Sequence, residues 1–263
     1  MDKTQTPSIS VPIHKNKLLE QVVGLTNNNQ ELTTLWKIAN IVAIERLHIT
    51  DHGYTHFQIV ANIALRIARI LVQNNIEMSI VKDYQLSNDY AEVVIFLASV
   101  MHDIGMSVNR EGHEDLAVPV SRDILKEILT FLPIEERTIV IAEVLHAIIS
   151  HRKDGRPITI EAGIVRIADA LDMANGRSRI PFETGKKINI HTISAYAIDK
   201  IDIKKGEEKP IEIDILMNNS SGLFQVDELL KKKLANSGIE QYFEIKAYTT
   251  GAHEKNLIKE FYL

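Results

Sequence analysis

Residues 90–105 read YAEVVIFLASVMHDIG, a mostly apolar run that ends in a histidine, an aspartate, an isoleucine and a glycine. Its apolar positions predict a buried helix over residues 90–101, with Asp89 as the N-cap. Asp103 therefore follows directly on a helix of the hydrophobic core. A carboxylate in such surroundings costs several kcal/mol unless an ion pair, hydrogen bonds or a cation compensates. This position predicts a functional site at the end of the helix.

Helical periodicity extends over most of the first two thirds of the chain. Residues 1–17, which contain Pro7 and Pro12, lack this periodicity and are expected to form a flexible arm. Thr50 and Asp51 are expected to cap a long helix that runs to Asn74. The other segments expected to be helical are residues 31–49, 114–132, 134–151 and 159–174.

After about residue 185 the pattern changes to short alternating segments. A seven-residue loop, 204–210, separates two of them as in a hairpin. We predict a mainly α protein, with an all-helical domain over residues 18–184 and a small α+β domain over 185–263 that leans on the first domain or on a second subunit. The expected strands are residues 187–193, 197–203, 211–216 and 242–248, and the expected helices are 223–236 and 252–262.

Composition narrows the chemistry that this chain can perform. The 263 residues include no cysteine, which excludes disulfides, zinc fingers of cysteine type, iron–sulfur clusters and thiol catalysis. A transition metal would have to be held by His, Asp or Glu. A net charge of −5 gives no basic field for nucleic acid, so nucleic acid is not an expected partner. Without an apolar run of membrane length or a signal-like start, we expect a cytoplasmic protein that does not interact with membranes.

Several ligand-type residues occur at the ends of the apolar helices. His52 and His56 are four residues apart, and Asp169 lies within the apolar stretch IVRIADALD. One interpretation is that an arginine, such as Arg66 or Arg166, neutralises the buried carboxylates. Because two aspartates and several histidines share this placement, convergence on a metal ion is the favoured interpretation.

His56, the pair His102–Asp103 and Asp169 together resemble the H…HD…D pattern of the HD-domain metal-dependent phosphohydrolase superfamily. The resemblance spans about residues 30–180 and is strengthened by the sequence VRIADALD around Asp169. It implies that these four residues hold metal, with His102 and Asp103 central to catalysis. The mixed nitrogen and oxygen donors suit Mn²⁺, Fe, Ni²⁺, Co²⁺ or Mg²⁺.

Further histidines suggest two or more metal ions. His113, His146 and His151 lie in the two regions where binuclear members of the superfamily, including the HD-GYP phosphodiesterases, place extra histidines. His52 is a candidate for an additional metal or a substrate contact. The Gly-Tyr-Pro motif itself is absent, and Met106 stands where HD-GYP proteins have a lysine. These departures count against a strict cyclic-di-GMP assignment.

Residues 134–180 also resemble the C-terminal HD-like region of exopolyphosphatase and guanosine pentaphosphatase proteins, whose kinase-like N-terminal domains are missing here. This resemblance links the chain to phosphorylated ligands. Substrate phosphate needs positive side chains, for which we consider Arg152, Lys153, Arg177 and Arg179. The run 231–233, three lysines, is interpreted as a solvated helix face.

The expected function is metal-dependent hydrolysis of a phosphodiester or phosphoester bond in a nucleotide-like substrate, with a hydroxide activated by the metal ions. A nucleotidase or an alarmone hydrolase is the alternative within the same class. A metal-bound sensor that binds a nucleotide without catalysis is the alternative from another class. A homo-oligomer is compatible with all three.

Overall fold

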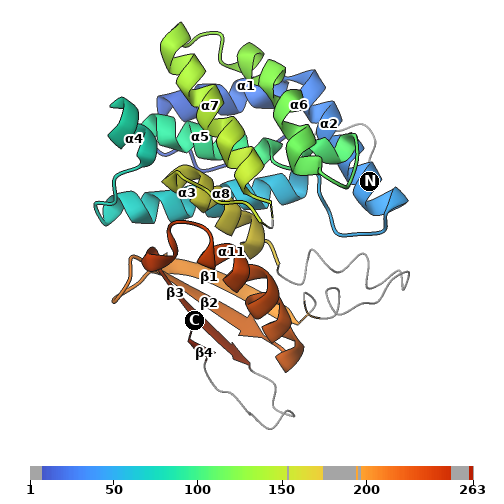
Figure 1. Cartoon of the computed structure of the whole chain (residues 1–263), viewed down its shortest axis with the longest axis vertical. Helices are drawn as coiled ribbons and strands as arrows, with labels where there is room; N and C mark the ends of the chain where they lie inside the picture. The colour runs from blue at the N-terminus through green and yellow to red at the C-terminus, as the bar shows by residue number, and fades with distance from the viewer. Residues whose placement is uncertain (1–7, 153, 174–193, 195–196, 250–260, 263) are drawn as a thin grey trace.

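The structure is a computed structural model that describes residues 8–152, 154–173, 194, 197–249 and 261–262 (Figure 1). It is mainly helical and ends in a small α+β part, as the sequence predicted. The helical part consists of α1 (Lys17–Asn28), α2 (Gln30–Asn40), η1 (Ile41–Arg46), α3 (Tyr54–Gln73), α4 (Ser79–Tyr84), α5 (Asn88–Met101), η2 (Ile104–Ser107), α6 (His113–Ile128), α7 (Ile134–Ser150) and α8 (Ile160–Leu171).

Helix α5 is the centre of the helical part. Every side chain from Val93 to Met101 is buried, because α1, α3, α7 and α8 all pack against it. The indole of Trp36 on α2 donates a hydrogen bond of 2.8 Å to the carbonyl of Val100. The sequence HDIG at the end of α5 is thereby fixed deep inside the helical part.

Two helix starts differ from the sequence-based expectation, whereas the first helix begins within one residue of the expected start of the helical domain. The Asp51 carboxylate accepts a hydrogen bond of 2.7 Å from the amide of Gly53, so α3 begins only at Tyr54 and His52 precedes the helix. Helix α5 has Ser87, not Asp89, at its N-cap position. A separate α1 begins at Lys17, where the Asn16 side chain caps it by accepting from the amide of Leu19.

Residues 8–16 pack against the helices and do not behave as the expected flexible arm. Ile9 and Val11 are buried in the core, and Ile9 exchanges two backbone hydrogen bonds with the Asn27 side chain on α1. These two apolar residues alternate with exposed residues. The pattern is too short to predict burial in a segment rich in proline and threonine. Residues 1–7 lie outside the described part.

The α+β part is a four-stranded sheet in the order β1-β2-β3-β4. Strands β1 and β2 form the predicted antiparallel hairpin, while β2 and β3 pair in parallel and β3 and β4 antiparallel. The segments are β1 (Ile198–Lys205), β2 (Ile211–Met217), η3 (Ser220–Gly222), η4 (Gln225–Lys231), α11 (Lys232–Ala235), η5 (Glu240–Tyr242), β3 (Phe243–Thr249) and β4 (Phe261–Tyr262).

The expected final helix over residues 252–262 is wrong at its end, because Phe261 and Tyr262 pair with β3 as a strand. Backbone pairing with a strand that is distant in sequence overrides the local helical pattern. Residues 252–260 and the expected strand 187–193 lie outside the described part.

One hydrophobic core joins the sheet to the helices. Val226 and Leu230 of η4 belong to the same buried cluster as Ile213 of β2 and the residues of α5. Figure 1 shows the sheet below the helical part, with α8 and α11 at the junction. A Cβ on Gly163 of α8 would lie 2.6 Å from the carbonyl oxygen of Ser237, so only glycine allows this approach.

By length and composition alone, two helical stretches are long and apolar enough to cross a membrane. They are residues 54–73 and 88–107, and 50% and 83% of their apolar windows are buried inside the protein. Both stretches pack inside the fold, the first against α5, α8 and β1 and the second against α1, α3 and α7.

We expect Gly163→Ala to destabilise the protein by about 1–3 kcal/mol, the usual cost of overpacking, because the added methyl would meet the backbone at Ser237. Gly24→Ala is the matched control on the exposed face of α1, where nothing lies within 4 Å of the added methyl. It should stabilise by about 0.5–1 kcal/mol through helix propensity. Chemical denaturation of both variants measures the difference, and equal stabilities would contradict the close docking at Gly163.

Candidate metal centre

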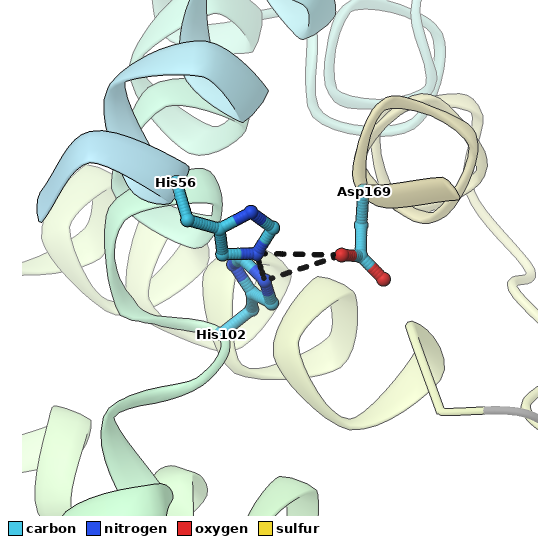
Figure 2. Close-up of side chains that lie close together, drawn as sticks. All are labelled: His56, His102 and Asp169. Carbon is cyan, nitrogen blue, oxygen red and sulfur yellow. Dashed lines mark hydrogen bonds and ion pairs between the residues drawn. The ribbon is translucent and has the colours of Figure 1, made fainter. Parts of the chain in front are cut away.

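His56, His102 and Asp169 converge from three helices. His56 lies in the first turn of α3, His102 directly follows α5 and Asp169 lies in the last turn of α8. The Nε2 atoms of the two histidines are 3.1 Å apart, and Asp169 Oδ1 lies 3.4 Å from His56 Nε2 and 3.7 Å from His102 Nε2 (Figure 2). Asp103 Oδ2 approaches the same two nitrogens, at 3.5 and 3.4 Å. The four residues of the H…HD…D pattern are thus brought together.

The other oxygen of Asp103 faces a second pair of histidines. Asp103 Oδ1 lies 2.9 Å from Nε2 of His113, the first residue of α6, and 3.4 Å from Nε2 of His151, which follows α7. A Cβ on Gly105 would lie 1.9 Å from the carbonyl oxygen of His113, so this glycine allows α6 to start so close to Asp103. Asp103 therefore stands between two groups of nitrogen donors.

The outer nitrogens of these histidines fix which nitrogen faces the centre. His102 Nδ1 lies 2.9 Å from the carbonyl of Ser99, and His56 Nδ1 lies 2.5 Å from Asp172 Oδ2. Because a carbonyl or carboxylate only accepts hydrogen bonds, each Nδ1 must carry a proton, so the neutral form of each imidazole has its lone pair on Nε2. The same holds for His52, His113 and His151, whose Nδ1 atoms contact the carbonyls of Thr50, Arg110 and Ile148.

Lone pairs and carboxylate oxygens facing one another repel unless a cation lies between them. These residues are therefore suited to bind a metal ion. The hydrogen-bond partner of each Nδ1 also sets the tautomer in which Nε2 can act as a metal ligand. Within the described residues, three overlapping groups hold their ligand atoms within 4.8 Å of one another. These groups are His56, His102 and Asp169; His102, Asp103 and His151; and His113, Glu114 and His151.

The ionisable side chains of the centre shift one another's pKa values. Burial alone would raise the pKa of Asp103, but the charge of protonated His102 and hydrogen bonds from the protonated forms of His102, His113 and His151 hold this pKa well below its ordinary value. Burial opposes protonation of His102 and His113 as well, yet the neighbouring Asp103 raises the pKa of both. Burial lowers the pKa of His151, although Asp103 opposes this shift. The carboxylates are therefore held ionised, ready to bind a cation.

His52 faces this centre, whereas His146 does not. The amide of Ile158 donates a hydrogen bond of 3.1 Å to His146 Nε2, and His146 Nδ1 lies 3.3 Å from Ser150 Oγ. The structure thus does not bring His146 together with the other histidines, since both of its nitrogens are engaged elsewhere. His52 Nε2 does face the centre, 3.9 Å from Asp103 Oδ2.

The described arginines considered from the sequence have hydrogen-bond or ion-pair partners outside the carboxylates of the centre. Arg152 is half exposed and pairs with Asp115 at 3.6 Å, while Arg66 pairs with Asp202 of β1. Lys153, Arg177 and Arg179 lie outside the described residues. Buried Arg166 donates to the carbonyls of Ser150, His151 and Arg152.

Glu114 and Asp172 were not expected in the site from the sequence, and Lys233 was expected on a solvated helix face. Asp172 follows Asp169 by three residues, a helical spacing that could have indicated a common site. Glu114 Oε2 lies 3.2 Å from His113 Nδ1. The Lys233 ammonium contacts Asp169 Oδ2 and, against the effect of burial, helps to hold the pKa of Asp169 well below its ordinary value. The interpretation of 231–233 as a solvated face is thus wrong for its last residue.

Comparison with known proteins identifies the family. Residues 53–174, the segment that carries the histidines and aspartates of the centre, match the family model described as the HD domain. The chain belongs to the HD-domain family. This HD-domain protein is also 41% identical over 233 residues to the uncharacterized protein MJ1020 of Methanocaldococcus jannaschii, a match that covers 88% of this chain and 89% of the relative. No solved structure matches significantly.

The two histidines near the end of α7 should differ in their effect on metal content. We expect His151→Ala to lower the metal bound per chain by about one equivalent, because its Nε2 faces Asp103. His146→Ala is the matched control on the same helix and should leave the metal content unchanged. Metal analysis of the Mn²⁺-loaded proteins measures both, and equal losses in the two variants would contradict the geometry.

Metal affinity should start to fall at a pH above the ordinary pKa of histidine. The raised pKa values of His102 and His113 mean that protons compete with the metal already above pH 6.5, the ordinary value. Mn²⁺ affinity should therefore fall as the pH decreases from about 8 to about 6. Titration calorimetry over this range tests this, and an affinity that stays constant would show that these imidazoles are not ligands.

Proposed function

We propose that this HD-domain protein is a phosphohydrolase that holds two divalent ions, one on each side of the Asp103 carboxylate. The observation that carries the proposal is the division of donors around Asp103. Its Oδ2 faces His56 and His102, while its Oδ1 faces His113 and His151. A carboxylate with one oxygen toward each donor group is suited to bridge two cations.

Each of the two positions has a recognisable donor set. His56, His102, Asp169 and Asp103 Oδ2 would hold one ion, and His113, His151 and Asp103 Oδ1 the other. Imidazole and carboxylate donors suit Mn²⁺, Fe, Co²⁺ or Ni²⁺, with Mg²⁺ favoured less by the nitrogen content. His52, 3.9 Å from Asp103 Oδ2, would add a ligand or a substrate contact beside the first position.

The surroundings prepare these residues for phosphoryl chemistry. Divalent ions bound by these residues would supply an activated water for attack on phosphorus and would polarise the phosphoryl group. The protein supplies fixed donors, since the side chains of His56 and His102 are fully buried and each is held at Nδ1. The contact between Asp172 and His56 orients the imidazole and raises its basicity, as carboxylate partners of metal-binding histidines do.

The substrate that we propose is a nucleotide-like phosphodiester or phosphoester. In the diester case, an oxygen from water bonds to phosphorus, the bond to one ester oxygen breaks, and a phosphomonoester and an alcohol result. A nucleotidase or an alarmone hydrolase would use the same centre. The complete set of donors favours catalysis over a sensor that only binds a nucleotide.

The experiment is a product-release screen with the Mn²⁺-loaded protein. Bis(p-nitrophenyl) phosphate and p-nitrophenyl phosphate distinguish diesterase from monoesterase activity, and a panel of cyclic dinucleotides, nucleoside monophosphates and alarmones then defines the substrate. We expect Asp103→Asn to lower the turnover at least about a hundredfold, because the isosteric amide cannot serve as a charged ligand to both ions.

His146→Ala, which leaves the proposed ligands intact, serves as the control and should keep most of the activity. A wild-type protein that is stabilised by nucleotides but releases no product would indicate the sensor instead. Full activity in Asp103→Asn would contradict the assignment of the centre.

A further inference from the structure

Lys233 belongs to the α+β part of the chain but reaches the metal centre of the helical part. Its ammonium contacts Asp169 Oδ2, and its side chain is only 19% exposed. The side chains of Lys231 and Lys232 are 51% and 53% exposed and pair with acidic residues one turn earlier. Lys233 is thus the member of this lysine run that is turned into the protein.

The backbone at Lys233 is fixed to the same elements that carry the ligands. Arg166 of α8 donates from Nε to the carbonyl of Lys233 at 3.0 Å. Its Nη1 donates to the carbonyls of Ser150 and His151 at 3.1 and 3.4 Å. One buried guanidinium therefore sets the position of Lys233 relative to His151 and, through α8, to Asp169.

The ammonium lies on the outer side of the Asp169 carboxylate. Oδ1 of Asp169 faces His56 and His102, and Figure 2 shows the second carboxylate oxygen turned away from both imidazoles. Lys233 contacts this second oxygen, so only the carboxylate of Asp169 separates its positive charge from the proposed cation position.

A lysine at this place does not help to retain a metal. Its charge repels a neighbouring divalent cation and competes with it for Asp169. An anion that contacts both the cation and the ammonium reverses this balance, since charge-assisted hydrogen bonds to phosphate oxygens are among the stronger polar interactions. The arrangement is therefore one that favours a bound phosphate group.

We propose that Lys233 binds a non-bridging oxygen of the substrate's phosphoryl group, so that the α+β part supplies one residue of the substrate site. The proposal rests on the proposed function for the metal positions and adds the residue that recognises the anion. Arg152, a candidate from the sequence, is half exposed and pairs with Asp115 instead. The ammonium of Lys233 contacts the carboxylate of Asp169, one of the proposed ligands.

The test measures binding of inorganic phosphate to the full-length Mn²⁺-loaded protein by titration calorimetry, which requires no turnover. Lys233→Met keeps the length of the side chain and removes its charge. We expect its phosphate affinity to fall at least about tenfold, with a metal content equal to or above that of the wild type. Lys231→Met is the matched control and should bind phosphate like the wild type, while Lys233→Arg should restore most of the affinity.

Two results would overturn the proposal. Unchanged phosphate binding in Lys233→Met, or no phosphate binding by the wild type, would remove Lys233 from the substrate site. Loss of Mn²⁺ in Lys233→Met would instead make Lys233 a residue that only positions Asp169. A wild-type protein that binds phosphate through Lys233 but hydrolyses no ester would leave this inference standing and would contradict the proposed function.

Discussion

The buried carboxylate of Asp103 is the constraint on which the rest of the site depends. It lies where α5 ends, almost without solvent, and an isolated charge there would be strongly destabilising. Imidazoles from the ends of other helices face both of its oxygens, and their own outer nitrogens are held by carbonyls or, for His56, by Asp172. The helices that pack around α5 must therefore place charge-compensating groups beside the Asp103 carboxylate as well as bury apolar surface. A bound divalent cation would compensate this charge.

Helix α8 connects this charge to the second part of the chain. Gly163, Arg166 and Asp169 are spaced three residues apart and form one ridge of the helix, and Asp172 follows as its C-cap residue. Along this ridge, Gly163 admits the backbone of Ser237, Arg166 fixes Lys233 and the end of α7, and the two aspartates hold the histidines. Docking of the α+β part and assembly of the metal centre thus use the same helix. Because α8 takes part in both, the sheet shares its hydrophobic core with the helices.

The sequence predicted the helical class and the buried α5 through periodicity. It predicted the convergence of His56, His102, Asp103 and Asp169 through the cost of buried charges together with the resemblance to the H…HD…D pattern. It predicted less well what depends on distant contacts. The role of Lys233 depends on α11 docking against α8, and the separation of His146 from the centre depends on the amide of Ile158, twelve residues later. His52 was placed on a helix because Asp51 looked like a cap, whereas its carboxylate binds the amide of Gly53 and delays the helix. The strand at Phe261 forms through pairing with β3, which no local pattern encodes.

The most direct test of the account is diffraction from crystals of the Mn²⁺-loaded protein at the manganese absorption edge. Anomalous scattering locates the ions independently of any assumption about the ligands. We expect two peaks, one between Asp103 Oδ2 and the His56–His102 pair and one between Asp103 Oδ1 and the His113–His151 pair. A single peak that does not contact Asp103, or ions bound only at other sites, would contradict the central claim that this carboxylate bridges two cations.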